Sequence, residues 1–440
     1  MKGQGKFTWN PLRRADDIDN LKCITSAEGC HIYDEYGKRY LDCQSGLWNV
    51  SLGYGNKHII DAIVNQLNKV TYVNPCEHTN DTVLRLSKKI IDITPEKFNS
   101  IFFTCTGSES VELAIKYVRK YQSLIGNYRK NKIAVLSASY HGSYYGSMSA
   151  SQVENNFKDG YGPFLDGFIS FPIPFCRCCK IDELKKECLD GFLIELEKNF
   201  EKYKEHLGAI ILEPILGSGG VITLHKEYLQ LLRELCDKYG VLLIFDEVAT
   251  GFGRTGKMFA FEHYQVIPDI ICLSKCMNSG YLPIGAVLIS DKVKEPFIKS
   301  ESLVFHLSTQ NCNPVCCASA EAVIDQLQEE NYIEAVEIKG KRLKEKLQER
   351  LIDHNLVFDI RGRGLMLSID LVDSKATNEL INKDKLDNII RLLKNRGLIV
   401  GKFHIDNVTA GIDLFPHFIV NEKDMDEIAD TISKVLNRFG

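Results

Sequence analysis

The stretch PDIICLSKCMNSGYLPIGAVLIS, from Pro268 to Ser290, decides how the fold of this chain is interpreted. The apolar run Ile270–Leu273 is typical of a buried strand, and a second apolar run follows at Ile284–Ile289. Lys275 stands just after the first run. Burying an ammonium group costs several kcal/mol without compensation, so either the chain carries Lys275 out to solvent or this lysine serves chemistry.

Strand-like and helical segments alternate on both sides of this stretch, between about residues 100 and 290. Seven apolar runs predict strands: SIFFTC, KIAVLSA, GFISF, GAIILEP, GVLLIFDE, DIICLS and GAVLIS. Helices are predicted at Ser108–Gln122 and Lys226–Tyr239. Continuous apolar strands separated by amphipathic helices indicate an α/β fold with a mostly parallel, seven-stranded sheet covered on both faces.

The pattern predicts three parts along the chain. Residues 58–325 hold the sheet in a large domain, and residues 326–440 form a smaller α+β C-terminal domain. Residues 1–57 form an N-terminal segment that packs with the small domain. In this segment, Gly29–Asp42 alternates around a turn and predicts a β-hairpin. One long helix is expected over about Ala318–Leu351.

Composition excludes several classes of protein. The net charge of the 440 residues is −4, and no basic run is present, so we expect no binding to nucleic acid or to an acidic membrane surface. No apolar stretch reaches the roughly 18–20 residues that a membrane span needs. The start of the chain lacks the apolar region of a signal peptide, and we therefore expect a cytoplasmic protein.

The chain has fifteen cysteines, most of them inside apolar runs where a thiol acts as a small hydrophobic group. One cluster stands out in FCRCCKIDELKKEC, with Cys176, Cys178, Cys179 and Cys188. A structural zinc site usually repeats a C-x₂₋₄-C pair, and here no second pair or spaced histidine follows. We therefore expect reduced loop thiols and no metal site.

Polar side chains follow the predicted strands at their carboxyl ends, where such sheets bind ligands. Gly107 and Ser108 open a helix and leave backbone N–H groups at its positive end, which suits a phosphate. The same pattern is also that of an ordinary helix cap. Asp246 closes an apolar strand and needs a cationic or N–H partner, in either a structural pair or a functional site.

Lys275 follows Asp246 by 29 positions (275 − 246), a spacing that suits the next strand of an α/β unit. A partly desolvated lysine has a lowered pKa and can attack a carbonyl to form a Schiff base. Tyr140, in SASYHGSYYG, offers a flat aromatic face. A phosphate cradle, an acid, an aromatic plate and an imine-forming lysine together are what pyridoxal 5′-phosphate (PLP) requires.

From about residue 7 to the C-terminus, the chain resembles the class III PLP-dependent aminotransferases, the ω-aminotransferase group. The resemblance rests on GLWNVSLGYG (46–55), TGSESVELAIKY, YHG, EP, DEVATGFGRTGKMFAFEH (246–263), LSK and TQNCNPV (309–315). It implies PLP as the cofactor, the PLP-dependent transferase fold type I, and an obligate homodimer with active sites shared at the subunit interface.

The resemblance also implies a role for each matching residue. Lys275 is expected to be the catalytic Schiff-base lysine, and Asp246 the partner of the pyridine nitrogen. The other expected cofactor-binding residues are Gly107 and Ser108 at the phosphate, Tyr140 and Val248 on the two faces of the ring, His141, Gly142 and Glu213 close by, and Thr309 from the other subunit. His141 is expected to form structural hydrogen bonds, because Lys275 already fits the acid–base role.

The implied reaction is a ping-pong transfer of an amino group from a primary amine or amino acid to a keto acid, aldehyde or ketone. Trp48 lines the substrate pocket in similar enzymes, although it could also fill the core. Many members carry an arginine near the C-terminus that grips a substrate carboxylate, but here the two usual positions hold Asp406 and Asp413. Arg361 or Lys402 could substitute for it, or the acceptor lacks a carboxylate.

Alternatives to this assignment stay open at this point. Ala249, after DEV, is shared with adenosylmethionine-8-amino-7-oxononanoate (diaminopelargonic acid) aminotransferase, which makes that enzyme the second choice of substrate. A PLP-dependent aminomutase, lyase or decarboxylase on the same fold, or a binder that has lost catalysis, is also compatible with the motifs. Arg254 is expected to form a structural ion pair rather than to hold a substrate.

Overall fold

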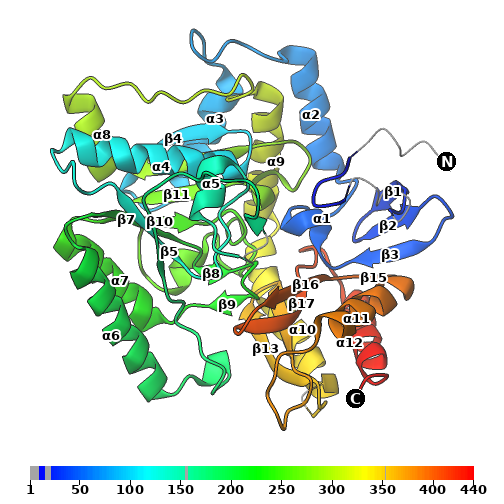
Figure 1. Cartoon of the computed structure of the whole chain (residues 1–440). Coiled ribbons are helices and arrows are strands. Elements are labelled where there is room, and N and C mark those ends of the chain that lie inside the picture. Colours follow the sequence, from blue (N-terminus) through cyan, green and yellow to red (C-terminus); the bar gives the residue numbers. More distant parts are fainter. Residues whose placement is uncertain (1–8, 15–20, 154–156, 352) are drawn as a thin grey trace.

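The computed structural model describes residues 9–14, 21–153, 157–351 and 353–440 (Figure 1). Within these residues, the largest sheet has seven strands in the order β4-β12-β11-β10-β7-β5-β6. The strands are β4 (Phe98–Thr104), β5 (Lys132–Leu136), β6 (Phe168–Phe171), β7 (Leu207–Leu212), β10 (Leu242–Asp246), β11 (Ile270–Leu273) and β12 (Gly285–Ser290). Strand β12 runs antiparallel to both its neighbours and the other pairs are parallel, which confirms the predicted sheet.

Both faces of this sheet are buried. Successive side chains of a strand point to opposite sides, so each strand contributes to a core on either face. Ile244 and Ile270 pack in a core with α4 (Gly107–Leu124) and α8 (Asp291–Lys299). Their neighbours Leu243 and Ile271 belong to a second core. The second core includes side chains of α3 (Asp81–Asp92), α6 (Lys186–Tyr203) and α7 (Lys226–Tyr239). This arrangement explains why the strands are apolar throughout.

A smaller antiparallel sheet lies in the C-terminal part, in the order β13-β14-β17-β16. Its strands are β13 (Val357–Arg363), β14 (Met366–Leu371), β16 (Gly401–Ile405) and β17 (Thr409–Leu414). The helices around it are α10 (Tyr332–Leu351), α11 (Lys383–Asn395) and α12 (Glu422–Leu436). The predicted α+β character of this region is confirmed, whereas the domain boundaries at 57/58 and 325/326 stay a prediction.

The N-terminal strands join the C-terminal part of the chain. Strands β1 (Ile24–Glu28), β2 (His31–Asp34) and β3 (Arg39–Asp42) form a sheet with β15 (Leu398–Ile399), which pairs with β3 in parallel. The antiparallel pair of β2 and β3 confirms the predicted hairpin. Residues 1–8 and 15–20 of the predicted N-terminal segment lie outside the described residues.

The prediction of one helix over Ala318–Leu351 is wrong. Two helices occupy this range, α9 (Pro314–Glu329) and α10. Asn331 stands between them with φ of 52°, in the left-handed region, and its carbonyl accepts the first hydrogen bond of α10. Apolar periodicity continued through the junction, but a residue in the left-handed conformation ends an α-helix.

The remaining elements are short or lie at the edges. They are α1 (Ser45–Trp48), α2 (Lys57–Lys69), α5 (Tyr145–Ala150), β8 (Ile215–Leu216), β9 (Ile222–Thr223) and the 3₁₀ turns η3 (Ile181–Glu183), η4 (Ala260–His263) and η5 (Lys275–Asn278). None of the helices in the described ranges is both long and apolar enough to cross a membrane.

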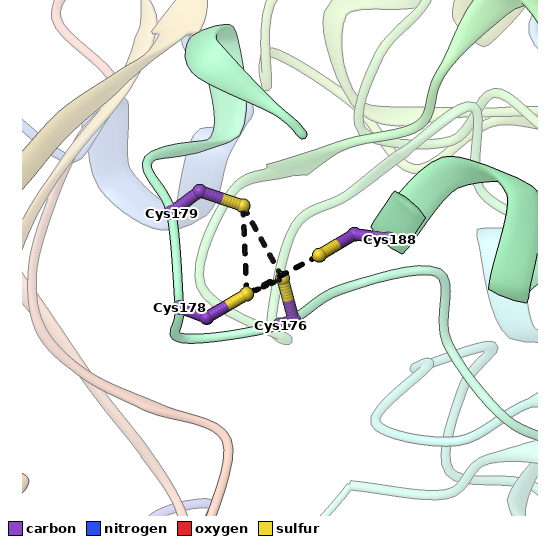
Figure 2. A group of neighbouring side chains, drawn as sticks. All are labelled: Cys176, Cys178, Cys179 and Cys188. Carbon is purple, nitrogen blue, oxygen red and sulfur yellow. Dashed lines mark hydrogen bonds between the residues drawn. The ribbon is translucent and has the colours of Figure 1, made fainter. Parts of the chain in front are cut away.

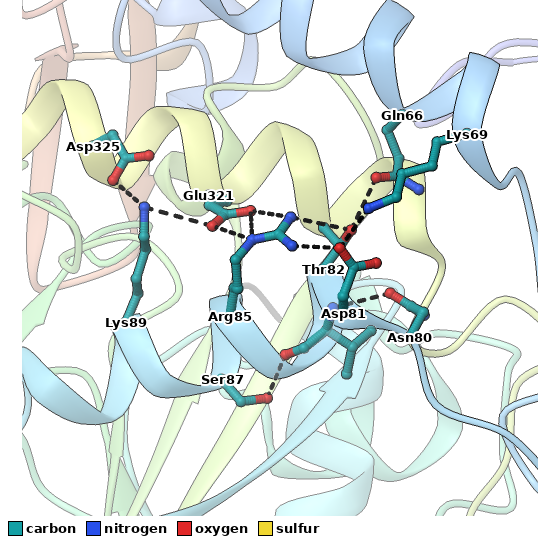
Figure 3. A network of polar contacts seen from close by, with 11 residues as sticks. Gln66, Lys69, Asn80, Asp81, Thr82, Arg85, Ser87, Lys89, Glu321 and Asp325 are labelled. Atoms are coloured by element: carbon teal, nitrogen blue, oxygen red, sulfur yellow. Dashed lines mark hydrogen bonds and ion pairs between the residues drawn. The ribbon is translucent and has the colours of Figure 1, made fainter.

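Ion pairs connect α3 to α9 across more than two hundred residues of sequence (Figure 3). Arg85 donates to Glu321 at 3.0 Å and also to Asp81 in its own helix at 2.5 Å. Lys89 pairs with Asp325 one turn further along. These side chains are partly exposed, so each pair contributes on the order of 1 kcal/mol or less. The network adds a small contribution to the apolar packing that holds α9.

Candidate active site

The sheet topology brings the polar strand ends together at one edge. Strands β7, β10 and β11 are parallel, so their carboxyl ends lie on the same side of the sheet. Asp246 is the last residue of β10, Glu213 follows β7, and Lys275 opens η5 two residues after the end of β11. The three side chains are close enough that Asp246 and Glu213 both act electrostatically on the Lys275 ammonium. The convergence predicted from the sequence is therefore present.

Asp246 is held by two hydrogen-bond donors in a buried environment. Its Oδ2 lies 2.8 Å from His141 Nδ1, and its Oδ1 accepts the backbone N–H of Val248 at 3.1 Å. The His141 side chain is fully buried. Within the described residues, His141 Nε2 has no hydrogen-bond partner. The His141–Asp246 contact fixes the direction of the Asp246 carboxylate, while His141 Nε2 is left without a hydrogen-bond partner.

Lys275 has an unusual backbone and an unusual environment. Its φ is 42°, in the left-handed region that few residues other than glycine adopt. The preceding Ser274 fixes the turn by donating from Oγ to the carbonyl of Ile284 at 2.7 Å. The Lys275 Nζ lies 4.7 Å from the centroid of the Trp48 ring. Burial lowers the pKa of Lys275, although Asp246 and Glu213 oppose this effect. A larger fraction of neutral amine is therefore present than for an exposed lysine.

Glu213 orients the chain around Tyr140. Its carboxylate accepts the backbone N–H of Tyr140 at 3.0 Å and that of Gly217 at 2.9 Å. Burial raises the pKa of Glu213 to about 7, the nearby His141 works against this rise, and Asp246 adds to it. Glu213 thus joins the segment after β5 to the segment after β7, and it positions the Tyr140 ring beside Phe157, at 5.8 Å between centroids.

The start of α4 packs against Val248, two positions after Asp246. Thr106 caps the helix by accepting the N–H of Glu109 at 3.1 Å. A Cβ added at Gly107 would lie 2.7 Å from Val248, so only glycine fits between the two segments. Ser108 Oγ accepts the N–H of Ser143 at 3.2 Å. The helix start therefore presents backbone N–H groups next to the loop that carries Tyr140.

Gly142 is constrained in the same way as Gly107. Its φ is 130°, and an added Cβ would lie 2.5 Å from Ser108 Oγ. Glycine at this position lets the loop after β5 approach the start of α4 closely. The structure therefore brings Gly107, Ser108, Gly142 and Val248 together, as the sequence pattern suggested.

Trp48 lies between the N-terminal part and the sheet edge. Its ring stacks on Phe415, with centroids 4.3 Å apart and an interplanar angle of 12°. Asp42 shapes the preceding turn by accepting the N–H groups of Gln44 and Gly46 at 2.9 and 2.7 Å. The ring is half-buried with Lys275 beside it, so it is both packed and exposed to the site.

Sequence reasoning missed two functional neighbours of these residues. Phe415 fixes Trp48 by stacking, yet it stands 367 positions away (415 − 48), and no local pattern joins the two. Glu247 accepts the N–H groups of Ala260 and Phe261 at 3.0 and 2.8 Å and closes the glycine-rich loop. The second acid directly after Asp246 was the available sequence signal for this role.

Thr309 lies in an exposed segment of the single chain. Its carbonyl accepts a hydrogen bond from the Tyr72 hydroxyl at 2.9 Å. His306 Nε2, three residues earlier, lies 3.0 Å from Glu109 Oε1 in the first turn of α4. This contact ties the Thr309 segment to the helix start that carries Gly107 and Ser108.

Two expected substrate residues do not fit that role. Arg361 is fully buried and donates to Asp370 Oδ2 at 2.7 Å, to Thr409 Oγ1 at 2.8 Å and twice to the carbonyl of Gly220. Its donors are used inside the protein and cannot grip a substrate. Lys402 is 52% exposed and pairs with Asp387 of α11. The structure therefore assigns Arg361 to internal packing and Lys402 to the surface.

Arg254 also differs from the expectation of an ion pair. It is fully buried and donates to the carbonyls of Leu365 and Pro416 at 3.0 and 2.6 Å. Its guanidinium lies 4.8 Å from the Phe418 ring centroid. Burial lowers the pKa of Arg254. The residue is structural, as expected, but its partners are carbonyls and aromatic rings.

Comparison with known proteins shows the family of this chain. A family model described as aminotransferase class-III matches residues 14–436. A taurine–pyruvate aminotransferase of Bilophila wadsworthia is 33% identical over 456 residues, which cover 99% of this chain and 97% of the relative. An adenosylmethionine-8-amino-7-oxononanoate aminotransferase of Staphylococcus aureus is 31% identical over 443 residues, with 99% and 96% covered.

A solved structure of a transaminase has the same fold as this chain. The PLP-bound amine transaminase from an uncultivated Pseudomonas species matches with a TM-score of 0.92 and 28% identity, covering 98% of this chain and 99% of the other. The chain belongs to the class III aminotransferases and is an enzyme, a transaminase. The predicted fold type I is confirmed.

Proposed function

We propose that this transaminase carries PLP on Lys275 and moves an amino group from a small amine or amino acid to a carbonyl acceptor by a ping-pong mechanism. The observation that carries the proposal is the position of Lys275. Its amine has a lowered pKa and lies at the sheet edge shared with Asp246, Glu213 and His141. Cytoplasmic location stays a prediction of the sequence.

The residues present fit this cofactor. Gly107 and Ser108 offer backbone N–H groups and a hydroxyl at the start of α4, which suits the phosphate. Tyr140 and Val248 would face the two sides of the flat ring, and Val248 lies directly against Gly107 at the start of α4. The Asp246 carboxylate, fixed by His141, suits a protonated ring nitrogen. His141 and Gly142 support these groups, and Glu213 holds the Tyr140 loop.

The chemistry divides between the cofactor and the chain. When bound, PLP supplies a conjugated ring that takes up an electron pair. Lys275 Nζ would hold the cofactor through its amine and, when free, would accept the proton next to the substrate nitrogen and return it. Its lowered pKa supplies the neutral amine that both roles require. Trp48 covers the Nζ and limits the access of water.

A second copy of the chain would complete the site. Leu303, Phe305 and Leu307 are 85%, 94% and 62% exposed, and they lie in the segment that leads to Thr309. Large apolar side chains exposed together mark a protein interface. We therefore propose a homodimer in which Thr309 reaches the phosphate site of the partner subunit. Sedimentation velocity at low concentration should give a dimer, and a monomer would contradict this assembly.

The substrate proposal rests on Asp413. This buried carboxyl accepts a hydrogen bond from Gln44 Nε2 at 2.6 Å, and burial raises its pKa to about 7. An acid at this position offers no cationic fork to hold a carboxylate, and Arg361 has no donor to spare. We therefore expect acceptors without a carboxylate to be used at least as well as keto acids. The adenosylmethionine-8-amino-7-oxononanoate reaction remains the second candidate, favoured by the relative that shares it.

The experiment that tests the cofactor proposal uses absorption spectroscopy. Protein purified with added PLP should show a visible band, borohydride should remove the band, and peptide mass mapping should locate the label on Lys275. Adding amines one at a time should then shift the band for those that donate. A chain that gains no band with PLP, or a label on another lysine, would overturn the proposal.

A further inference from the structure

Four cysteine side chains converge in the loop between β6 and α6 (Figure 2). The Sγ atoms of Cys176, Cys178, Cys179 and Cys188 all lie within 4.8 Å of one another. Cys176 Sγ is 3.1 Å from Cys178 Sγ and 3.3 Å from Cys179 Sγ, and Cys178 Sγ is 3.2 Å from Cys188 Sγ. The four sulfurs point toward a common centre, although they come from a loop and from the start of a helix.

The separations of the four sulfurs are compatible with one metal ion bound between them and not with a disulfide. A disulfide needs two sulfurs about 2.0 Å apart, and all four thiols are free. A tetrahedral Zn²⁺ with Zn–S bonds of about 2.3 Å places its sulfurs about 3.8 Å apart. The Cys178–Cys179 separation is 3.8 Å, and the separations of 3.1, 3.2 and 3.3 Å would widen by about half an ångström around the ion. Four thiolates also favour soft, tetrahedral ions over calcium or magnesium, which take oxygen ligands.

The fold removes the reason for expecting no metal site. That expectation rested on the missing second C-x₂₋₄-C pair. Cys176, Cys178 and Cys179 lie in a tight loop, and the chain then turns through η3 so that Cys188, in the first turn of α6, returns to face them. The fourth ligand is therefore supplied by a helix start instead of a second pair.

Neighbouring contacts hold the loop in place without occupying the sulfurs. Arg177, between the first two cysteines, donates to Asp370 Oδ1 at 3.3 Å and to Asn378 Oδ1 at 3.2 Å. Its guanidinium lies 4.9 Å from the Phe358 ring centroid. The side chain thus reaches the small sheet while the flanking thiols face inward. Cys178 is exposed and the other three are half-buried, so an ion can reach the site from solvent.

We propose that Cys176, Cys178, Cys179 and Cys188 bind one structural Zn²⁺ ion. Binding converts four thiols and Zn²⁺ into a tetrathiolate of net charge −2 and releases four protons, with no electron transferred. All four positions are filled by protein, which is typical of structural and not catalytic zinc. The ion clamps the β6–α6 loop to the start of α6 beside the small sheet. The proposal is independent of the cofactor on Lys275.

The experiment measures metal content and cobalt spectra of the purified full-length chain. Protein prepared with zinc in the medium should contain about one zinc per chain by mass spectrometry. Adding Co²⁺ to chain freed of metal should give the visible absorption of a tetrahedral cobalt thiolate. Cys178→Ser and Cys188→Ser should each lose the zinc and these bands, whereas Cys76→Ser, which changes an exposed cysteine outside the cluster, should keep both.

Several outcomes would overturn the proposal. They are wild-type chain without zinc and without cobalt bands, zinc retained by both cluster variants, or alkylation and mass analysis showing disulfides among the four cysteines. If the cluster variants are insoluble, the test moves to the wild-type chain. A strong chelator should then remove the zinc and lower the Tm, and added zinc should restore it. A Tm that is unchanged after complete removal of zinc would reject a structural role.

Discussion

Two buried charge clusters in this chain differ in how their hydrogen-bonding groups are used. Around Arg361, the guanidinium is bound to Asp370, Thr409 and the carbonyl of Gly220, and Asp370 also accepts from Thr409. Around Asp246, the carboxylate is fixed on both oxygens, but His141 Nε2 has no partner among the described residues.

The difference separates structure from chemistry. A closed network such as that of Arg361 has no group left to meet a ligand, so its loss should appear as lost stability. The Asp246 cluster combines a buried nitrogen without a hydrogen-bond partner and a lysine of lowered pKa, so its loss should appear as lost activity. Substitutions in the two clusters can test this distinction directly.

The largest effect is expected at Lys275. Lys275→Ala removes the amine that attacks the carbonyl and moves the proton, so kcat/KM should fall by about 10⁴-fold or more. The free energy of unfolding of the cofactor-free protein should not fall, because burial already disfavours the charged form of the amine that the substitution removes. Steady-state kinetics and urea unfolding measure the two quantities. Transamination at the wild-type rate would refute the role of Lys275.

Arg361→Met should act on stability. The substitution leaves Asp370 buried with one partner fewer, which typically costs about 3–5 kcal/mol of unfolding free energy. The kcat/KM per folded molecule should stay close to that of the wild type. Urea unfolding and kinetics on the same preparation separate the two effects. Normal stability with a raised KM for keto acids would instead restore Arg361 to the substrate site.

Asp246→Asn tests the Asp246 cluster, where we expect lost activity instead of lost stability. Asparagine keeps an oxygen that can accept from Val248, but it removes the negative charge that faces His141. We expect kcat to fall by about 10²–10³-fold, the range seen when one preorganised electrostatic group is lost. The absorption band of bound cofactor should also shift. A variant with wild-type kcat would place the functional charge elsewhere.

Asp413→Asn should change how stability depends on pH. The folded pKa of Asp413 is about 7 and its ordinary value is about 3.9, so between these pH values the folded chain binds more protons than the unfolded chain. Stability therefore falls as pH rises through this window, by up to about 1.4 kcal/mol per pH unit for one proton. In the variant, the contribution of this one proton is absent. Its free energy of unfolding should therefore fall less than that of the wild type as pH rises, and the variant should be relatively more stable above pH 7.

Urea unfolding at pH 5 and pH 8 measures this change. Glu213 and Glu247 also have a pKa raised by burial to about 7, so some dependence should remain in the variant. An identical slope in the variant and the wild type would show that Asp413 is ionised in the folded chain at both pH values.

The smallest effect is expected for Lys402→Ala. Its pair with Asp387 is about half exposed on both sides, and pairs of this kind contribute about 0–1 kcal/mol. Activity toward keto acids should stay within about twofold of the wild type, which makes this variant the matched lysine control for Lys275→Ala. A large rise in KM for keto acids alone would return Lys402 to the substrate site.

The sequence by itself determined the strands of the large sheet and the order of the polar residues at their carboxyl ends. Apolar runs predicted all seven strands. Parallel neighbouring strands have their carboxyl ends at the same edge, so Asp246 and Lys275 could be placed together before any coordinates. The helix junction at Asn331 was missed, because apolar periodicity does not report a single left-handed residue.

Only the tertiary structure decided which distant groups are partners. Trp48 stacks on Phe415, Arg361 is bound internally, and Cys188 returns to the other three cysteines of its loop. Each of these contacts depends on how loops fold back and how the two sheets pack. Local sequence carries the period of a strand or helix, whereas the pairing of side chains across elements is set by packing, which no local pattern encodes.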